Sequence, residues 1–133
     1  MISKSRISLI ARTESSKAST ALTEARAESL NLPWYVWRTS KDARVRSSHR
    51  HMDGVLIAWA EAPSPEALKG LKSYGTYQAG NTFNCRCYPE PLIYLDQVSW
   101  PHKVYHNGTI REMTRSAFKK INSGYISTYR KAA

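Results

Sequence analysis

The sequence predicts an α+β fold: a small mixed or antiparallel sheet packed by an N-terminal helix, with a hairpin and a short C-terminal helix. Three observations lead to this prediction. Helical periodicity covers the N-terminal part, runs of aromatic and β-branched residues occupy the middle, and an Asn-Gly dipeptide divides two strand-like runs near the C-terminus. With 133 residues, of which 41% are hydrophobic, the chain suits a single domain spanning 1–133.

Residues 5–29 are predicted to form the first helix, which Pro33 stops. Apolar residues recur there near the 3.6-residue spacing of a helix: Ile7, Ile10, Ala11, Ala18, Ala21, Leu22, Ala25 and Leu30. Because alanine allows close approach, we expect this apolar face to lie on the sheet. Ser15 and Ser16 lower the helix propensity and could break the helix there.

Three strands are predicted in the middle of the chain. Residues 34–38 and 55–59 are mostly aromatic or β-branched, which suits a half-buried pleated surface. Both faces of the first strand are apolar, so the sequence does not decide which of its two tryptophans points into the core. A third strand over 85–95 contains Pro89 and Pro91, so we expect it to be an edge strand or a bent segment.

Short helices and turns are predicted between these strands. Residues 45–52 fit a short helix, and Asp53-Gly54 marks a turn. Ser64 is the expected N-cap of a single helical turn that has Pro65 at its first position.

A hairpin is predicted after an irregular Gly- and Asn-containing loop over 70–84. Residues 103–106 and 109–112 flank Asn107-Gly108, the preferred dipeptide of a tight type I′ turn. The sequence therefore pairs these two runs as antiparallel neighbours.

The last helix is predicted over 115–121, with Thr114 as its N-cap. Ser123-Gly124 is expected to end it. Residues 124–133 are then a basic tail, which we expect to be flexible.

The chain is strongly basic, with twenty Lys and Arg against ten Asp and Glu and a formal net charge of +10. Such an excess favours contact with polyanions, of which nucleic acid is the commonest. A solvated basic surface, or a face that docks on an acidic protein, is the alternative. No apolar run is long enough for a membrane span or a signal peptide, so we expect no membrane contact and a cytoplasmic origin.

Two polar stretches about thirty residues apart, 42–54 and 84–87, combine histidine, carboxylate and thiol groups. Zinc takes four such ligands, often as two close pairs from two segments. In a reducing cytosol the two cysteines are better read as thiols or metal ligands than as a disulfide. The candidate ligands are His49, with Asp53 or His51, and Cys85 with Cys87.

A structural role for the same residues is the alternative. Cysteine is among the most often buried residues, so both thiols could pack under the first helix. Asp53 would cap the turn at Gly54, and His49 would hydrogen-bond a backbone carbonyl. Arginines would pair with carboxylates across the two segments: Arg44, Arg46 and Arg86 with Asp42, Glu14 or Asp53.

Catalysis is another alternative, and the sequence predicts no catalytic residue. A small nuclease or toxin-like enzyme domain could use His49 and His51 as acid and base on a phosphodiester. A non-specific DNA-binding module, without catalysis, is a further alternative. His102 and His106 are expected to be a surface pair. The chain has no Ser-His-Asp signature, P-loop or G-x-G-x-x-G motif, so nothing supports acyl transfer or nucleotide chemistry.

Four blocks in order along the chain resemble the phage Mu protein F-like head morphogenesis family. They are Ile10-Ala11-Arg12-Thr13-Glu14, then Trp37, then Asp42, Arg44, Arg46, His49 and Asp53-Gly54 in one spaced pattern, then Asn84-Cys85-Arg86-Cys87. Each block alone is common, whereas four in order over residues 10–87 are specific.

The resemblance implies a structural, non-enzymatic minor head protein of a tailed bacteriophage or prophage. It implies a role in head (procapsid) assembly and in DNA packaging or ejection near the portal. The implied partners are portal and capsid proteins, with packaged double-stranded DNA as a further partner consistent with the charge. The implied location is the host cytoplasm during assembly and then the virion.

The resemblance also bears on the metal and on the chain ends. Relatives carry a Cys-x-x-Cys pair before the Asp-Gly turn and a His before the Cys-Arg-Cys; here Arg46, His49 and Thr82 occupy those positions. Three likely zinc ligands then remain, and Asp53 or His51 would be the fourth. Relatives also have a long helical region before the first block, so we expect a split product, a remnant or an isolated C-terminal domain.

Overall fold

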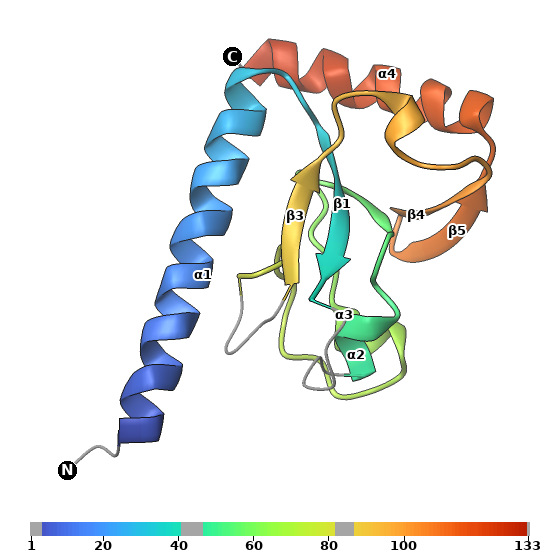
Figure 1. Ribbon diagram of the computed structural model, residues 1–133. Helices are drawn as coiled ribbons and strands as arrows, with labels where there is room; N and C mark the ends of the chain where they lie inside the picture. The colour runs from blue at the N-terminus through green and yellow to red at the C-terminus, as the bar shows by residue number, and fades with distance from the viewer. Residues whose placement is uncertain (1–3, 41–46, 82–86, 133) are drawn as a thin grey trace.

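The computed structural model describes the backbone of residues 4–40, 47–81 and 87–132, and the side chains of 13–40, 49–81 and 87–124 (Figure 1). Five strands form one mixed sheet in the order β3-β1-β2-β4-β5. The elements are α1 (Lys4–Ser29), β1 (Trp34–Thr39), α2 (Ser47–Arg50), β2 (Leu56–Ala58), α3 (Pro65–Leu68), β3 (Cys87–Pro91), the 3₁₀ turn η1 (Leu95–Gln97), β4 (His102–His106), β5 (Thr109–Met113) and α4 (Arg115–Ala132). The predicted α+β class is confirmed.

The sheet is antiparallel except at one junction. β1 pairs antiparallel with β2 and β3, and β4 with β5, whereas β2 and β4 are parallel, with Leu56 opposite Val104. β3, which contains two prolines, is an edge strand, as predicted. Asn107 and Gly108 have φ of 51° and 79°, the two positive values that a type I′ turn requires, so the predicted hairpin turn is confirmed.

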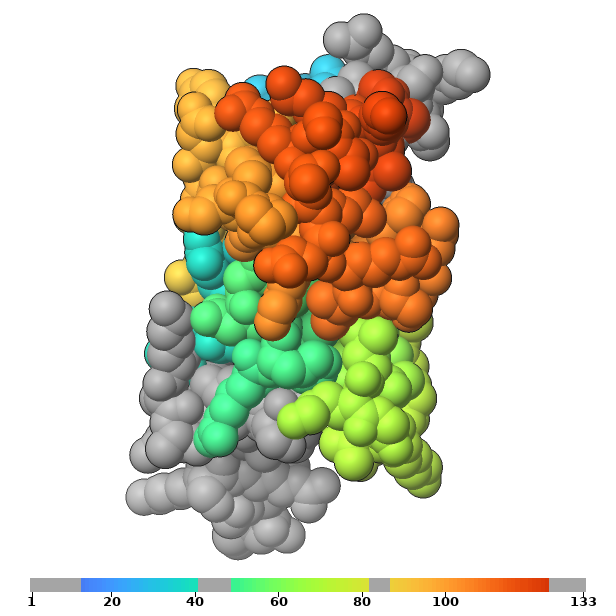
Figure 2. Space-filling view, turned by 90° about the vertical axis from the view of Figure 1, so that its right-hand side faces the viewer, coloured from blue at the N-terminus to red at the C-terminus, as the bar shows by residue number. Residues whose placement is uncertain are grey.

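The sheet is buried on both faces, and β1 contributes one tryptophan to each. Trp37 belongs to the first core, together with Met52, Val55 and Ile57. Trp34 belongs to the second core, whose other members are Val36, Leu56, Ala58, Leu92, Val104 and Phe118. The last three of these come from the C-terminal part of the chain. Figure 2 shows the C-terminal residues spread over this end of the molecule. Both tryptophans are therefore fully buried.

α1 is unbroken at Ser15–Ser16 and runs beside β3 (Figure 1). It docks through hydroxyl groups: Ser16 Oγ donates to the carbonyl of Gly80, and Thr20 Oγ1 donates to that of Ala79, each over 2.8 Å. These bonds satisfy two carbonyls in the buried stretch 77–80, which has no strand or helix partner of its own.

The prediction that α1 packs on the sheet through its apolar face is wrong for the side chains that the structure describes. The small and apolar residues at helical spacing point to solvent: Ala18, Ala21, Leu22, Ala25 and, just after the helix, Leu30. The buried positions on the opposite side are Thr13, Thr20 and Ala27. Hydroxyl side chains are favoured on this side of α1 because they donate to the loop carbonyls, and a buried carbonyl without a donor costs about 1–3 kcal/mol.

Replacing Gly80 with alanine should be strongly destabilising. Its φ is +83°, and an added Cβ would lie 2.5 Å from Thr20 Oγ1 and 3.0 Å from the carbonyl oxygen of Cys87. Gly75→Ala is the matched control, because its φ is +94° with no atom within 4 Å of the new Cβ. We expect both to lose roughly 1–2 kcal/mol from backbone strain and Gly80→Ala about 1–3 kcal/mol more from the clash. Urea unfolding checks this, and equal losses would contradict it.

The predicted end of the last helix is wrong, because α4 continues through Gly124 to Ala132. Phe118 anchors it between Trp34 and Trp100, with ring centroids at 4.9 and 5.2 Å. An interior glycine costs only about 1 kcal/mol relative to alanine, which does not stop a helix held by such packing. The flexibility of 124–133 stays a prediction. Among the described residues, no helix has the length and apolarity to cross a bilayer.

Candidate functional site

His49 and Cys87 come together from the two polar segments. The imidazole Nδ1 of His49, on α2, lies 3.6 Å from the Cys87 Sγ at the start of β3. Both side chains are buried, with exposures of 1% and 4%. The fold thus joins the two segments under the first face of the sheet.

Tyr77 and Glu66 complete this cluster on the other side of the imidazole. The Tyr77 hydroxyl donates to Glu66 Oε2 over 2.6 Å and lies 2.7 Å from His49 Nε2. His49 Nε2 is itself 3.4 Å from Glu66 Oε2. All four side chains are buried. We call His49, Glu66, Tyr77 and Cys87 the buried cluster.

An aromatic wall screens the buried cluster from water. The Trp37 ring packs edge-on against the His49 ring, with centroids 5.9 Å apart. The centroid of the Tyr77 ring lies 6.4 Å from that of Trp37. In such surroundings hydrogen bonds are stronger and an unmatched polar group is more costly. Removing any one member should therefore affect the whole cluster.

Sequence reasoning missed Glu66. It is the second residue of the turn α3, where Ser64 accepts from the Ala67 amide as the predicted N-cap and Pro65 comes first. A carboxylate at a helix start is usually solvated and favourable to the helix dipole. No local signal marks this one as buried, because its partners come from Tyr77 and His49, distant in sequence.

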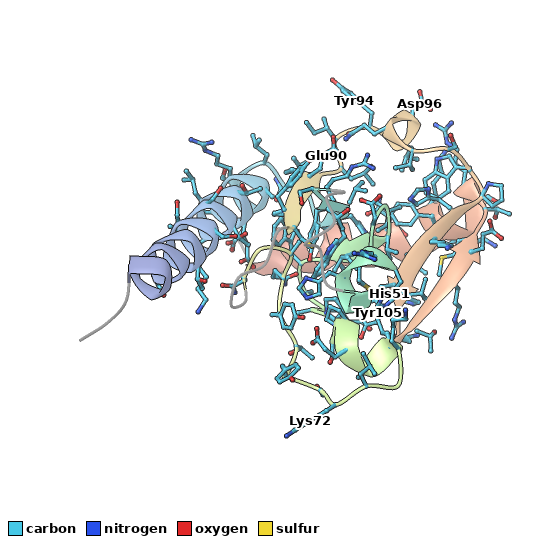
Figure 3. All side chains as sticks on the ribbon, turned by 60° about the horizontal axis from the view of Figure 1, so that its bottom comes forward. His51, Lys72, Glu90, Tyr94, Asp96 and Tyr105 are labelled. Atoms are coloured by element: carbon cyan, nitrogen blue, oxygen red, sulfur yellow. The ribbon has the colours of Figure 1, made fainter. Side chains whose placement is uncertain are left out.

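Asp53, in the turn before β2, lies beside the last residue of β1. Its Oδ1 accepts from the backbone amide of Thr39 over 3.0 Å, and the Gly54 amide donates to the Trp37 carbonyl. The carboxylate thus ties the turn to β1, which differs from the expected cap of its own turn. His51 is half-buried, beyond the end of α2 (Figure 3).

His102 is not the surface residue that was expected. Its Nε2 donates to the carbonyl of Gly54, and its ring is half-buried. This contact connects β4 with the Asp53-Gly54 turn. His106, at the far end of the same strand, is likewise half-buried.

Several predicted residues lie outside the described residues. They are Asp42, Arg44, Arg46, Asn84, Cys85 and Arg86, together with the side chain of Arg12. Glu14 is described and is exposed on α1.

The donor chemistry of His49 and Cys87 fits half of a zinc site. Two ligand atoms about 2.1 and 2.3 Å from a tetrahedral zinc lie about 3.6 Å apart, the separation observed here. The other imidazole nitrogen faces a carboxylate and a phenol, as is usual for a metal-bound histidine. In the described parts of the chain, however, no three His, Cys, Asp or Glu side chains are grouped to hold a metal.

The burial of His49 weighs against the nuclease alternative. Only 1% of the residue is exposed, so a phosphodiester backbone has no approach to its imidazole. General acid–base catalysis needs direct or single-water contact with the reacting group.

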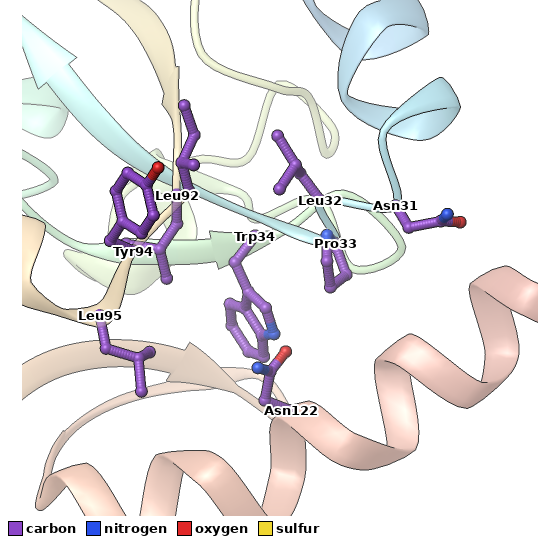
Figure 4. A pocket seen from close by; sticks show the side chains of 9 residues that line it. Asn31, Leu32, Pro33, Trp34, Leu92, Tyr94, Leu95 and Asn122 are labelled. Carbon is purple, nitrogen blue, oxygen red and sulfur yellow. The ribbon is translucent and has the colours of Figure 1, made fainter.

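A separate pocket of about 180 Å³ lies between the end of α1, the start of β1 and α4 (Figure 4). Leu32, Trp34, Leu92 and Leu95 form its apolar walls, and the Asn122 amide faces it. Its described lining residues include Tyr94 and Asn122 but no His, Cys, Asp, Glu, Lys or Arg, so it resembles neither a metal site nor an acid–base site.

Tyr77→Phe should destabilise the protein by about 1–3 kcal/mol, because Glu66 loses a buried donor. Tyr74→Phe is the matched control, since Tyr74 is 74% exposed and should change stability by less than about 0.5 kcal/mol. Denaturant midpoints measure both. Identical midpoints would show that the hydroxyl contributes nothing.

Comparison with known proteins agrees with the four sequence blocks. The family model described as "Phage Mu protein F like protein" matches residues 1–89, which include the whole buried cluster. An uncharacterised protein of Haemophilus influenzae is 39% identical over 88 residues, covering 66% of this chain but 17% of that relative. No solved structure matches. The resemblance is confirmed, and the chain belongs to the phage Mu protein F-like family of head morphogenesis proteins.

Proposed function

We propose that this protein is a structural minor head protein of a tailed bacteriophage or prophage. In this role it takes part in procapsid assembly and in DNA packaging or ejection near the portal. The match of the family model to residues 1–89 carries the proposal. The portal and capsid proteins would be its partners, and it would move from the host cytoplasm into the virion.

The buried cluster supports a structural role. Its polar groups are directed at one another, and they connect α2, α3 and β3. Such a cluster specifies how these segments meet, because the hydrogen bonds among His49, Tyr77 and Glu66 form only in this arrangement. By holding α2, α3 and β3 in fixed positions, the buried cluster would also keep the outer surface of these segments in a fixed shape for assembly contacts.

Co-purification with phage heads tests the proposal. The tagged chain would be expressed together with the head genes of the phage or prophage that encodes it, and heads would be isolated on gradients. We expect the chain in heads and in pull-downs of the portal protein. Tyr74→Phe serves as a matched control for tag and expression. Heads that form normally while excluding the folded wild-type chain would contradict the proposal.

Zinc binding by His49, Cys85 and Cys87, with Asp53 or His51 as a fourth ligand, is a second proposal. The 3.6 Å separation of His49 Nδ1 from Cys87 Sγ favours it. Elemental analysis of the purified protein should give one zinc per chain, lost in Cys87→Ser. Protein that is folded and free of zinc after purification without chelators would leave the buried cluster as a purely hydrogen-bonded one.

A further inference from the structure

We propose that the outer side of α4 and the adjoining strand β5 bind the backbone of double-stranded DNA without regard to sequence. The residues that would make the contact are Arg111, Arg115, Lys119 and Lys120, here called the basic face. This surface lies outside the family-matched residues 1–89. The inference does not depend on a head role, because it rests on charge and geometry alone.

Positive charge is concentrated in the C-terminal segment. Residues 92–133 contain seven Lys and Arg but only two Asp and Glu, so less than a third of the chain carries half of its net charge. α4 itself contains five basic residues and no acidic one. A polyanion would therefore be attracted to this helix.

The cations of the basic face are available for binding. Arg111, Lys119 and Lys120 are exposed, and no described carboxylate forms an ion pair with any of them. Arg115 has a partner, Asp96, at 3.3 Å, but the two side chains are 48% and 86% exposed. A solvated pair of this kind is worth little, so a phosphate can replace the carboxylate.

The remaining acidic residue of the segment is directed away. Glu112 lies opposite Lys103 in the β4–β5 pairing. Alternate residues of a strand point to opposite faces, so Glu112 and Arg111 lie on different faces of the sheet. The face that carries Arg111 is the one on which Val104 and Phe118 pack, beneath α4.

The spacing of the charges suits a phosphate backbone. Arg115 and Lys119 are one helical turn apart, about 6 Å along the axis, and duplex DNA carries one charge per about 1.7 Å. Ser116 is exposed on the same helix, and its hydroxyl could donate a hydrogen bond to a phosphate oxygen.

The exposed side chains in the described part of α4, residues 115–124, suit a duplex backbone better than other partners. Between 115 and 124 the exposed residues of α4 are Arg115, Ser116, Ala117, Lys119, Lys120, Ser123 and Gly124. A membrane-surface helix would add large apolar groups, a protein interface an apolar or aromatic centre, and a single-strand site aromatic platforms. Cations with small polar residues are what contact with a duplex backbone needs.

α4 holds the basic face in a fixed position. Phe118 is fully buried between Trp34 and Trp100. Because the helix is already anchored, binding would order only the long cationic side chains. Figure 1 places α4 at the opposite end of the molecule from α3, which is followed by Lys69 and Lys72.

Charge reversal on α4 tests the proposal against a matched reversal elsewhere. Binding of a labelled duplex of mixed sequence would be measured by fluorescence anisotropy at several salt concentrations. The test variant is Lys119→Glu/Lys120→Glu, and the control is Lys69→Glu/Lys72→Glu, whose lysines are also exposed. Both change the net charge equally. We expect the test variant to bind at least tenfold more weakly, with a salt slope shallower by about 2, and the control to lose less than threefold.

Additional arms keep the result interpretable. Lys119→Arg/Lys120→Arg should bind like wild type, and Lys119→Gln/Lys120→Gln replaces the glutamate variant if thermal unfolding shows that the latter is unfolded. Equal losses in test and control, a preference for single strands, or binding of polyglutamate in place of the duplex would overturn the proposal. None of these outcomes bears on whether the chain enters phage heads.

Discussion

A chain that ends at Pro91 will not unfold cooperatively. Truncation there removes Leu92, which follows β3, and also β4, β5 and α4, so the second core loses Leu92, Val104 and Phe118. Trp34 and Val36 would then face water from a sheet reduced to three strands. Burial of one large apolar side chain is worth about 1.5–3 kcal/mol, so losing the burial of several of them is comparable with the about 5–15 kcal/mol that stabilises a typical domain.

Circular dichroism and thermal unfolding would measure this loss against two full-length controls. Phe118→Ala removes one core side chain and should cost about 3–5 kcal/mol while keeping a cooperative transition. Lys120→Ala, on the exposed side of the same helix, should stay within about 0.5 kcal/mol of wild type. A truncated chain with a sharp transition near that of the intact protein would show that the second face needs no cover.

Trp37→Ala is expected to cost about 3–5 kcal/mol, and Trp34→Ala a similar amount. The two rings lie in different cores and are 0% and 1% exposed. Trp37 also forms the wall beside His49, so its removal should additionally admit water to the buried cluster. Chemical denaturation gives both values.

Tyr88→Ala, at an exposed position of β3, is the matched aromatic control and should cost less than about 1 kcal/mol. If either tryptophan variant behaved like this control, that face of β1 would not be a core. The thiol reactivity of Cys87 offers a second readout, since Trp37→Ala should make it react faster than Trp34→Ala does.

The elements that local chemistry determines could be predicted from the sequence. Asn107-Gly108 specified its turn, Ser64-Pro65 its helix start, and two prolines the edge position of β3. In each case the signal and the structure lie within a few residues of one another. The sheet class followed from these local elements.

The docking of α1 could not be predicted, because its partner is a loop. Ser16 and Thr20 bind carbonyls about sixty residues away, and no periodicity reports such bonds. The same limit applies to Glu66, whose burial depends on Tyr77 and His49. The sequence did not decide whether Trp34 or Trp37 points into the core. Because the sheet is covered on both faces, both are buried.

The candidate site was predicted in part. The meeting of His49 with Cys87 was expected from the two polar stretches 42–54 and 84–87, whereas the Asp53 carboxylate accepts from the Thr39 amide. The helix end at Gly124 was wrong because packing of Phe118 overrides a weak local preference.

The parallel pairing of β2 with β4 has a consequence for synthesis of the protein. β2 ends at Ala58, and its outer neighbour arrives only with Val104, followed by Phe118. At about 5–20 residues per second, the ribosome needs roughly 3–12 s to cover that interval. For this time the apolar surface that carries Trp34 lacks its cover, and exposed apolar surface of this kind is prone to aggregation.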